Sequence, residues 1–410
     1  MLAPERRSRV DIIAAAALVV AVVVAITVIW FHSDARGTTS VTAETPAVPP
    51  KTALTIPDTL RPIWDAPSAA TSVPLTAGGA VVTAEGGTVT GRDARDGREL
   101  WHYQRNMPLC GVVNSWGTAV AVYRDQRGCS QVTDLDGADG SRKAQRSSDA
   151  DQELTLSSDG TYVVAQGDTR LEAWRSDLVR TIEYGRIPAA VQPKAQPRTG
   201  CRIDSAGSST SRLAVLERCP KENNDRLTML NPAPKDNQKP EEYGSSVIAA
   251  LAPGVDGARV LAVSGDKAAV YLPAGGKDGP RIGVFDGEAN PIQQYALSKP
   301  LADDAVVAKN ASNFTIWTGS QLIAVRAADF VPIWAAEGVL GPGSTMAGSL
   351  VVPVVGGLAV LDPSNGREVR KLDVARNDAD GKPVTQGPIN TTVLGNFVLE
   401  QRGDKVVALG

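Results

Sequence analysis

Few residues in this 410-residue chain are suited to metal or nucleophile chemistry, since it contains only two histidines and four cysteines. It also lacks an excess of one charge, because 42 Lys and Arg face 45 Asp and Glu. A nucleic-acid-binding protein would need a basic excess or stripe, so no nucleic-acid partner is expected. The motifs of zinc peptidases, serine hydrolases and P-loop proteins are missing as well. A hydrophobic content of 42% nevertheless predicts a folded globular protein.

One long hydrophobic run is present, close to the N-terminus. Residues 12–31 carry no charged side chain, and a helix of this length spans the roughly 30 Å core of a bilayer. Arg6, Arg7 and Arg9 precede the run, so the positive-inside rule places the N-terminus in the cytoplasm. A cleaved signal peptide is the alternative, but its apolar core is usually about 7–15 residues and is followed by a small-residue cleavage site. We therefore expect a single-pass protein of the cytoplasmic (inner) membrane with an extracytoplasmic C-terminal part.

Four regions are predicted along the chain. They are a short cytoplasmic tail (1–10), a transmembrane signal anchor (11–32), a flexible linker (33–60) and a folded extracytoplasmic domain (61–410). The linker is predicted from its richness in Pro, Thr, Ala and Ser and from the lack of an apolar period.

The folded region repeats one pattern of short strands and tight turns. In its clearest copy, two predicted strands within 80–92 are followed by the turn Asp93–Gly97 and by a third strand that reaches Trp101. A near twin at 350–370 contains the turn Asp362–Gly366. Eight copies can be aligned, spaced by 36 to 56 residues, and their central strands end at Asp93, Asp136, Arg175, Asn231, Asp286, Arg326, Asp362 and Gly410.

Repeats of this length, with several strands in each, predict an all-β fold in the form of an eight-bladed β-propeller. Seven blades remain an alternative because the copies at 143–183 and 201–243 are weak. The eighth copy stops at Gly410, where its outer strand should follow, whereas an unmatched segment, Arg61–Asp65, precedes the first copy. We therefore expect this N-terminal strand to complete the last blade and close the ring.

The segment from Asp93 to Trp101 resembles the blade motif of the PQQ-like (quinoprotein-type) β-propeller repeat superfamily. Asp362, Gly366 and Trp334 occupy matching positions in later copies. In this motif the Asp and Gly suit a tight turn, and the Trp packs flat between neighbouring blades. The chain is also similar to membrane-anchored envelope proteins of high-GC Gram-positive (actinobacterial) bacteria. The superfamily includes both quinoprotein dehydrogenases and non-catalytic outer-membrane assembly scaffolds, so the resemblance implies a fold rather than a function.

Dehydrogenases of this superfamily commonly have two adjacent cysteines, a tryptophan platform under the cofactor, and Asp or Asn metal ligands. No two cysteines are adjacent in this sequence. Trp116 and Trp317 are candidates for a pocket, although core aromatics are the simpler interpretation. No catalytic, cofactor-binding or metal-binding residue is therefore predicted.

The four cysteines fall in two close pairs within the predicted exterior region, an oxidising environment. Four cysteines allow three connectivities. Cys110 with Cys129 and Cys201 with Cys219 are the predicted disulfides, because each pair fits neighbouring strands of one blade.

A rigid propeller without recognisable catalytic groups is expected to bind other molecules on its faces or in its central funnel. We predict a membrane-anchored, non-catalytic scaffold for an envelope protein partner. Binding of a glycan or small ligand in the funnel, or a divergent quinoprotein-like or hydrolytic enzyme, are the alternatives.

Overall fold

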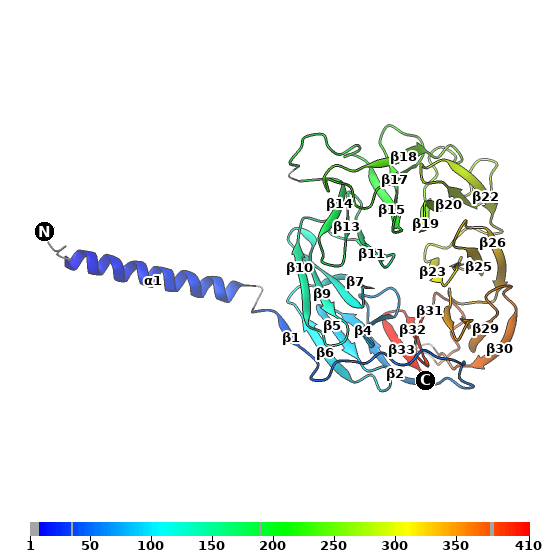
Figure 1. Cartoon of the computed structure of the whole chain (residues 1–410), viewed down its shortest axis with the longest axis horizontal. Coiled ribbons are helices and arrows are strands. Elements are labelled where there is room, and N and C mark those ends of the chain that lie inside the picture. The colour runs from blue at the N-terminus through cyan, green and yellow to red at the C-terminus, as the bar shows by residue number, and fades with distance from the viewer. Residues whose placement is uncertain (1–7, 34–35, 189, 378–380) are drawn as a thin grey trace.

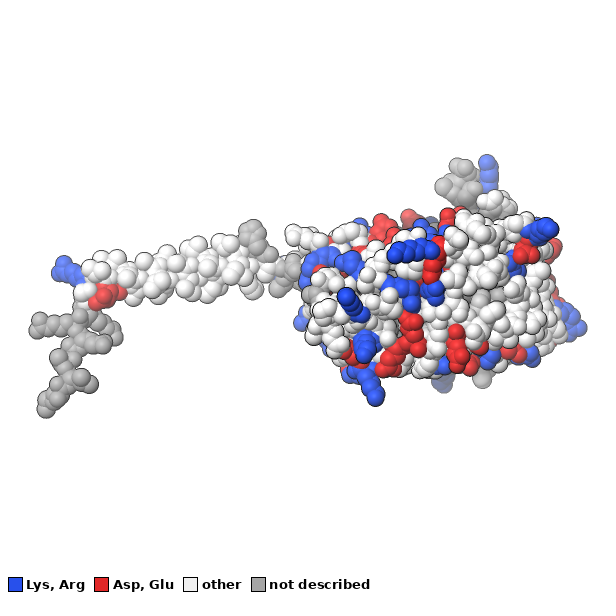
Figure 2. Space-filling model, turned by 90° about the horizontal axis from the view of Figure 1, so that it is seen from above, with Lys and Arg blue, Asp and Glu red and all other residues white. Residues whose placement is uncertain are grey.

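The structure is a computed structural model that describes residues 8–33, 36–188, 190–377 and 381–410, and this part contains one helix and 33 strands (Figure 1). Helix α1 (Arg9–His32) begins with a capping box, in which the Ser8 hydroxyl accepts the Asp11 N–H and the Asp11 carboxylate accepts the Ser8 N–H. Its mean hydropathy of 3.2 over an unburied 18-residue window makes it long and apolar enough to cross a membrane. Figure 2 shows this helix without charge between its ends.

The strands form eight antiparallel sheets, the blades, arranged around a central axis. From the inner to the outer strand, blade 1 contains β3 (Leu75–Ala77), β4 (Ala80–Glu85), β5 (Thr88–Arg92) and β6 (Glu99–Gln104); blade 2 contains β7 (Leu109–Ser115), β8 (Thr118–Asp125), β9 (Gly128–Asp136) and β10 (Arg142–Ser147); blade 3 contains β11 (Thr155–Ser158), β12 (Val163–Gln166), β13 (Arg170–Trp174) and β14 (Arg180–Gly185); and blade 4 contains β15 (Arg202–Ser208), β16 (Leu213–Arg218), β17 (Arg226–Leu230) and β18 (Glu242–Val247).

The second half of the ring is built in the same way. Blade 5 contains β19 (Arg259–Ser264), β20 (Lys267–Leu272), β21 (Arg281–Phe285) and β22 (Pro291–Ala296); blade 6 contains β23 (Val306–Asn310), β24 (Asn313–Trp317), β25 (Gln321–Arg326) and β26 (Pro332–Glu337); blade 7 contains β27 (Ser344–Met346), β28 (Ser349–Val354), β29 (Gly357–Leu361) and β30 (Glu368–Asp373); and blade 8 contains β31 (Asn390–Leu394), β32 (Phe397–Arg402), β33 (Lys405–Leu409) and β2 (Pro62–Pro67).

The eight-bladed prediction is confirmed, and the seven-bladed alternative is wrong. Each of the eight predicted end positions lies at, or one residue after, the end of the third strand of a blade. The two weak copies are complete blades, 3 and 4.

The predicted ring closure is also confirmed. Strand β2 pairs with β33, so the outer strand of blade 8 comes from the N-terminal side of the domain. The backbones of Arg61 and Gly410 exchange two hydrogen bonds of 3.0 Å directly beyond this pairing. Blade 8 therefore has a paired fourth strand, and β33 is not left as an open sheet edge.

The hydrophobic core is divided among the contacts between blades. Its buried residues form eight clusters, and each cluster joins the facing sides of two successive blades, including blade 8 with blade 1. Strands two and three of each blade are buried almost throughout, because both faces of each blade are covered by a neighbour.

The prediction of a flexible linker over 33–60 is corrected from Thr39 onward. Strand β1 (Thr39–Val41) pairs with β6 as a fifth strand of blade 1. Residues 43–60, which we call the strap, then follow the propeller surface. Ala43 and Ala47 donate backbone hydrogen bonds to the β9–β10 turn, and Leu60 is 1% exposed. The N–H groups of this extended segment donate to carbonyls of a turn, so it needs no periodic pattern of apolar residues. Its composition therefore resembles that of a linker.

The strap takes the place of a turn that blade 8 lacks. In the other blades a turn joins the third strand to the outer strand, whereas in blade 8 those two strands come from opposite ends of the domain. Arg370 on blade 7 donates hydrogen bonds to the carbonyls of Ile56 and Pro57 and to the carboxylate of Asp58. The strap is therefore part of the folded domain.

Candidate functional site

The outer strand of every blade has the same irregularity. Its second residue is the unpaired residue of a β-bulge, and these eight residues are Ile63, Leu100, Lys143, Thr181, Tyr243, Ile292, Ile333 and Val369. A bulge bends the strand and redirects the side chain that follows it. In blades 1, 6 and 8 that following residue is a tryptophan, which contacts the next blade.

The predicted motif residues meet across blades rather than within one. Trp64 of blade 8 donates to the carbonyl of Ala94 in the Asp93–Gly97 turn of blade 1, at 3.0 Å. A Cβ on Gly97 would lie 2.7 Å from the Trp64 indole, so only glycine fits there. Trp334 of blade 6 is placed in the same way over Gly366 of blade 7, and its indole N–H donates to Pro363 at 2.9 Å.

Trp101 forms the third contact of this kind. Its side chain is fully buried, and its indole N–H donates to the Gly137 carbonyl of blade 2 at 3.0 Å. The turn residues Asp93 and Asp362 close their own turns, each accepting a backbone N–H two residues later at 2.9 Å. The Arg95 guanidinium that also binds Asp93 lowers the pKa of this carboxyl to about 2. Trp64, Trp101 and Trp334 therefore contact turns of the following blades, and Asp93 and Asp362 close two of those turns.

The structure contains both predicted disulfides. Cys201 and Cys219 flank the paired ends of neighbouring strands β15 and β16, with a Cα–Cα distance of 4.2 Å. Cys110 and Cys129, with a Cα–Cα distance of 6.0 Å, lie on β7 and β9. That geometry corrects one detail, because β8 lies between those two strands, so the bridged cysteines are not on neighbouring strands.

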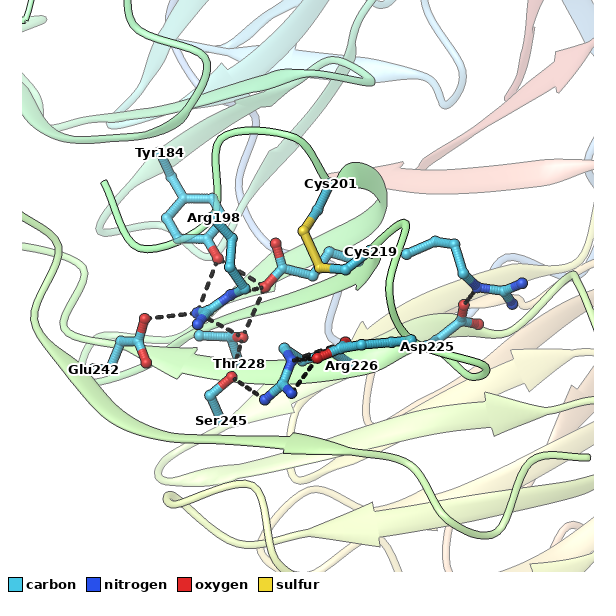
Figure 3. The surroundings of a disulfide bond; sticks show 12 residues. Tyr184, Arg198, Cys201, Cys219, Asp225, Arg226, Thr228, Glu242 and Ser245 are labelled. Atoms are coloured by element: carbon cyan, nitrogen blue, oxygen red, sulfur yellow. Dashed lines mark hydrogen bonds and ion pairs between the residues drawn. A yellow bond between two sulfur atoms is a disulfide. The ribbon is translucent and has the colours of Figure 1, made fainter. Parts of the chain in front are cut away.

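A buried charge network lies beside the second disulfide (Figure 3). The carboxylate of Glu217 is fully buried and accepts hydrogen bonds from Tyr184 (2.7 Å), Arg198 (2.8 Å) and Thr228 (3.0 Å). Arg198 also pairs with Glu242 on β18 at 2.6 Å. Since Arg198 belongs to the long connection from blade 3 to blade 4, the network fastens that connection to blade 4.

The sulfur atoms of Cys201 and Cys219 lie within 4.8 Å of the Glu217 carboxylate, a grouping that resembles a metal site. A metal needs thiolate ligands, however, and the two sulfurs are bonded to each other. Cys201, Cys219 and Glu217 therefore have a structural role as long as the disulfide is formed.

A second buried network joins blades 2 and 3, because Arg146 of β10 pairs with Glu172 of β13 at 3.4 Å. Arg170 binds Glu172 at 2.6 Å and Glu183 at 2.5 Å, and the indole N–H of Trp174 donates to Glu172 at 2.8 Å. Burial pushes the pKa of Glu172 upward, but the charges of Arg146 and Arg170 outweigh this effect, so the pKa is lowered. Neither network could be predicted from the sequence, because nothing in the spacing of these residues shows that they meet.

The centre of the ring holds a cavity of about 570 Å³ between the inner strands of blades 1, 2 and 3 and Val307 of blade 6. Asn114, Ser115 and Ser158 contribute polar groups to its wall, and Trp116 contributes an indole. Trp116 is in a turn with a positive φ of 54° and donates to Thr161 of blade 3 at 3.2 Å. None of the described lining residues is ionisable, so the wall offers hydrogen bonds and an aromatic surface rather than acid–base groups. Trp317, the other pocket candidate, is a core aromatic that is 3% exposed.

A larger groove of about 910 Å³ lies between blade 8 and the connection from blade 7. Its described wall combines Asp65, Asn390, Arg402 and Lys405 with the apolar surfaces of neighbouring residues such as Pro388. Charges of both signs are also interspersed on the rim of the propeller, which Figure 2 shows edge-on.

These features define a closed, eight-bladed propeller with quinoprotein-type blade contacts and two disulfides. Residues 53–171 match the family model described as outer membrane protein assembly factor BamB, so the resemblance to PQQ-like repeats is confirmed. No curated protein matches the chain.

Solved structures show the same fold. BamB from Moraxella catarrhalis is 14% identical, with a TM-score of 0.50, and covers 85% of this chain and 99% of its own. The computationally designed Ika8 protein is 13% identical, with a TM-score of 0.56 and coverages of 86% and 99%. Quinohemoprotein alcohol dehydrogenase ADHIIG from Pseudomonas putida HK5 is 12% identical, with a TM-score of 0.51 and coverages of 89% and 78%. At these identities the likeness concerns the fold alone.

Proposed function

We propose that this protein is a membrane-anchored extracytoplasmic scaffold that holds a protein partner during assembly of the cell envelope. The observation that carries the proposal is the way in which the apolar helix continues into the propeller. Only residues 33–38 separate the end of α1 from β1, which is already a strand of blade 1. Six residues reach at most about 20 Å, so the rim of blade 1 would be held close to the membrane surface.

Three further features agree with a scaffold. Two disulfides suit an oxidising compartment outside the cytoplasm. The contacts between blades and the attachment of the strap suit a rigid support. The matched family model, moreover, is that of an assembly factor.

The proposal is tested by cross-linking the tagged full-length protein in cells and identifying the captured proteins by mass spectrometry. The control is the anchor alone, residues 1–38, because residues 39–60 belong to the folded domain. We expect one or two envelope proteins to be enriched by the full chain only. Identical profiles from the two samples would contradict the scaffold proposal.

Binding of a glycan or small polar ligand in the central cavity is the second candidate function. It is favoured by the uncharged wall of hydroxyl and amide groups beside the Trp116 indole. A ligand that binds only the folded state raises the melting temperature by mass action. Trp116→Ala should abolish such an increase when the purified full chain is screened with envelope oligosaccharides.

A further inference from the structure

The outer strand of each blade is the edge of a sheet, and an exposed edge invites pairing with another chain. Most blades of this ring protect that edge. Blade 1 is covered by β1. Blade 3 is covered by a loop, whose Asn237 carbonyl accepts the Glu183 N–H at 2.8 Å. The edge strand of blade 8 has proline at both ends and Asp65 between them.

The edges of three other blades are protected by charge. Strand β10 carries Arg142, Lys143 and Arg146. Strand β30 has four charged residues among its six. In blade 4, Arg212 lies 3.6 Å above the ring of Tyr243, the bulge residue. Charged and covered edges of this kind disfavour pairing with a further strand.

Blade 5 differs from the rest. Its edge strand β22 reads Pro-Ile-Gln-Gln-Tyr-Ala and is the only outer blade strand of the described structure without a charged side chain. Five of its six residues are exposed, and Ile292 at the bulge is 51% exposed. Strand β26 of blade 6 is the most similar, but it ends in Glu337.

The free edge of β22 also presents backbone donors. Leu297 donates its N–H inward to Pro280, at 2.8 Å. Because successive N–H groups of a strand point in opposite directions, those of Ala296 and Gln294 point away from the blade. Strand β22 is the last strand of its sheet in the described structure, so no further strand accepts from these groups.

We propose that the edge of β22 is the docking site for an extended segment of a protein partner, which adds to blade 5 as a fifth antiparallel strand. This inference rests on the proposed scaffold function and names its binding surface. Backbone pairing would supply the affinity, and the uncharged edge would select an uncharged segment rich in Thr, Ser and Val.

Blade 1 already contains a fifth strand, and its pairing indicates what kind of segment could bind β22. In blade 1 the segment Thr39-Ser40-Val41 is the fifth strand, and its partners are residues four to six of β6. Strands β6 and β22 have the same length and the same bulge position. Arg105, which follows β6, donates inward to Gly87 just as Leu297 does after β22. A segment like β1 would therefore meet Gln294, Tyr295 and Ala296 in the same register.

The position of blade 5 suits a partner. It lies opposite blade 1 in the ring, so β22 is on the far side of the disc from β1 and the membrane attachment (Figure 1). A protein docked there would not compete with the strap for space. The lack of lysine and arginine on β22 makes a phosphate headgroup a poor match for this edge.

The test places a photo-cross-linking amino acid at position 296 of the full-length protein in cells, with position 373 as the matched control. Asp373 is the last residue of β30 and has the same ladder position on a charged edge, since the following Val374 donates inward to Gly356. We expect an adduct at 296 and none at 373. The captured segment is then identified, synthesised as a peptide and titrated against the purified full chain.

We expect Ala296→Pro, which removes one outward N–H, to weaken peptide binding at least tenfold, and Asp373→Pro to change it less than twofold. Ala296→Lys keeps the backbone donor but adds a charge to the edge, so it should also weaken binding. This variant serves as the test if the proline variant fails to fold. Equal affinity of both position-296 variants and the unmodified protein would overturn the inference.

The remaining outcomes separate this inference from the proposed function. An adduct with a second copy of this chain would overturn it in favour of a dimer. No adduct at 296, while the full chain still enriches partners, would overturn the β22 site and leave the scaffold standing. No adduct and no enriched partner would overturn both.

Discussion

Gly97 shows how single residues hold this ring together. It has a positive φ of 72°, and a Cβ would lie 2.7 Å from the indole of Trp64 on the preceding blade. Gly86 is the matched control, because its φ is also positive at 58° but nothing lies within 4 Å of an added Cβ. Gly97→Ala should therefore cost the roughly 1–2 kcal/mol of a left-handed alanine plus about 1–3 kcal/mol of overpacking. Gly86→Ala should cost only the first.

Denaturant unfolding of the detergent-solubilised full chain measures both glycine variants. Equal losses of unfolding free energy would show that the tryptophan–glycine contact between blades does not determine the choice of glycine at position 97.

Glu172 provides a pH test at the same scale. Its carboxylate is buried with Arg170, and its pKa is lowered in the folded state by the nearby arginines despite burial. Its stabilising contribution is therefore complete above the ordinary glutamate pKa of about 4.3, and it is lost as the pH falls toward the lower folded-state pKa. Glu172→Gln should destabilise the protein by about 3–5 kcal/mol at neutral pH and flatten the fall in stability between about pH 5 and pH 3.

Unfolding midpoints measured across this pH range, with the exposed Glu153→Gln as control, check the expectation. A slope that Glu172→Gln leaves unchanged would contradict the role of this ion pair in acid sensitivity.

At the scale of elements, the strap is the segment whose role differs most from its composition. Two leucines within it provide a matched pair, since Leu60 is 1% exposed and Leu54 is 91% exposed. If the strap is part of the folded domain, Leu60→Ala should cost about 2–5 kcal/mol through lost burial and a residual cavity. Leu54→Ala should change stability by less than about 0.5 kcal/mol. Similar small effects of both changes on thermal unfolding would mean that the strap is detached in solution.

At the scale of the whole molecule, the division of the core into eight contacts between blades predicts that distant blades contribute independently. The disulfides lie in blades 2 and 4, each closing a loop of about 20 residues worth roughly 3 kcal/mol in the chain-entropy model. Removing each by paired Cys→Ser changes should lower stability by about that amount. The fourfold variant should lose the sum to within about 0.5 kcal/mol. A coupling free energy above about 1 kcal/mol would show that the blades are energetically linked across blade 3.

The repeats in the sequence predicted eight blades, with seven as an alternative, and the sequence also predicted the closure of the ring and the two disulfide pairs. These features depend on local signals that recur: a turn such as Asp93–Gly97 forms from its own residues, and a repeat of known length has one way to close. Cys201 and Cys219 could be paired because few residues separate them.

Which segments cover which surfaces could not be predicted from the sequence. The strap lies on the propeller because turn carbonyls far along the chain accept its N–H groups. Glu217 is satisfied by an arginine from a separate connection, and the blade 3 edge is covered by a loop from blade 4. Such contacts join residues without a common pattern, so composition and spacing do not reveal them. The exposure of the β22 edge could not be predicted either, because an edge stays exposed only when no other described segment covers it.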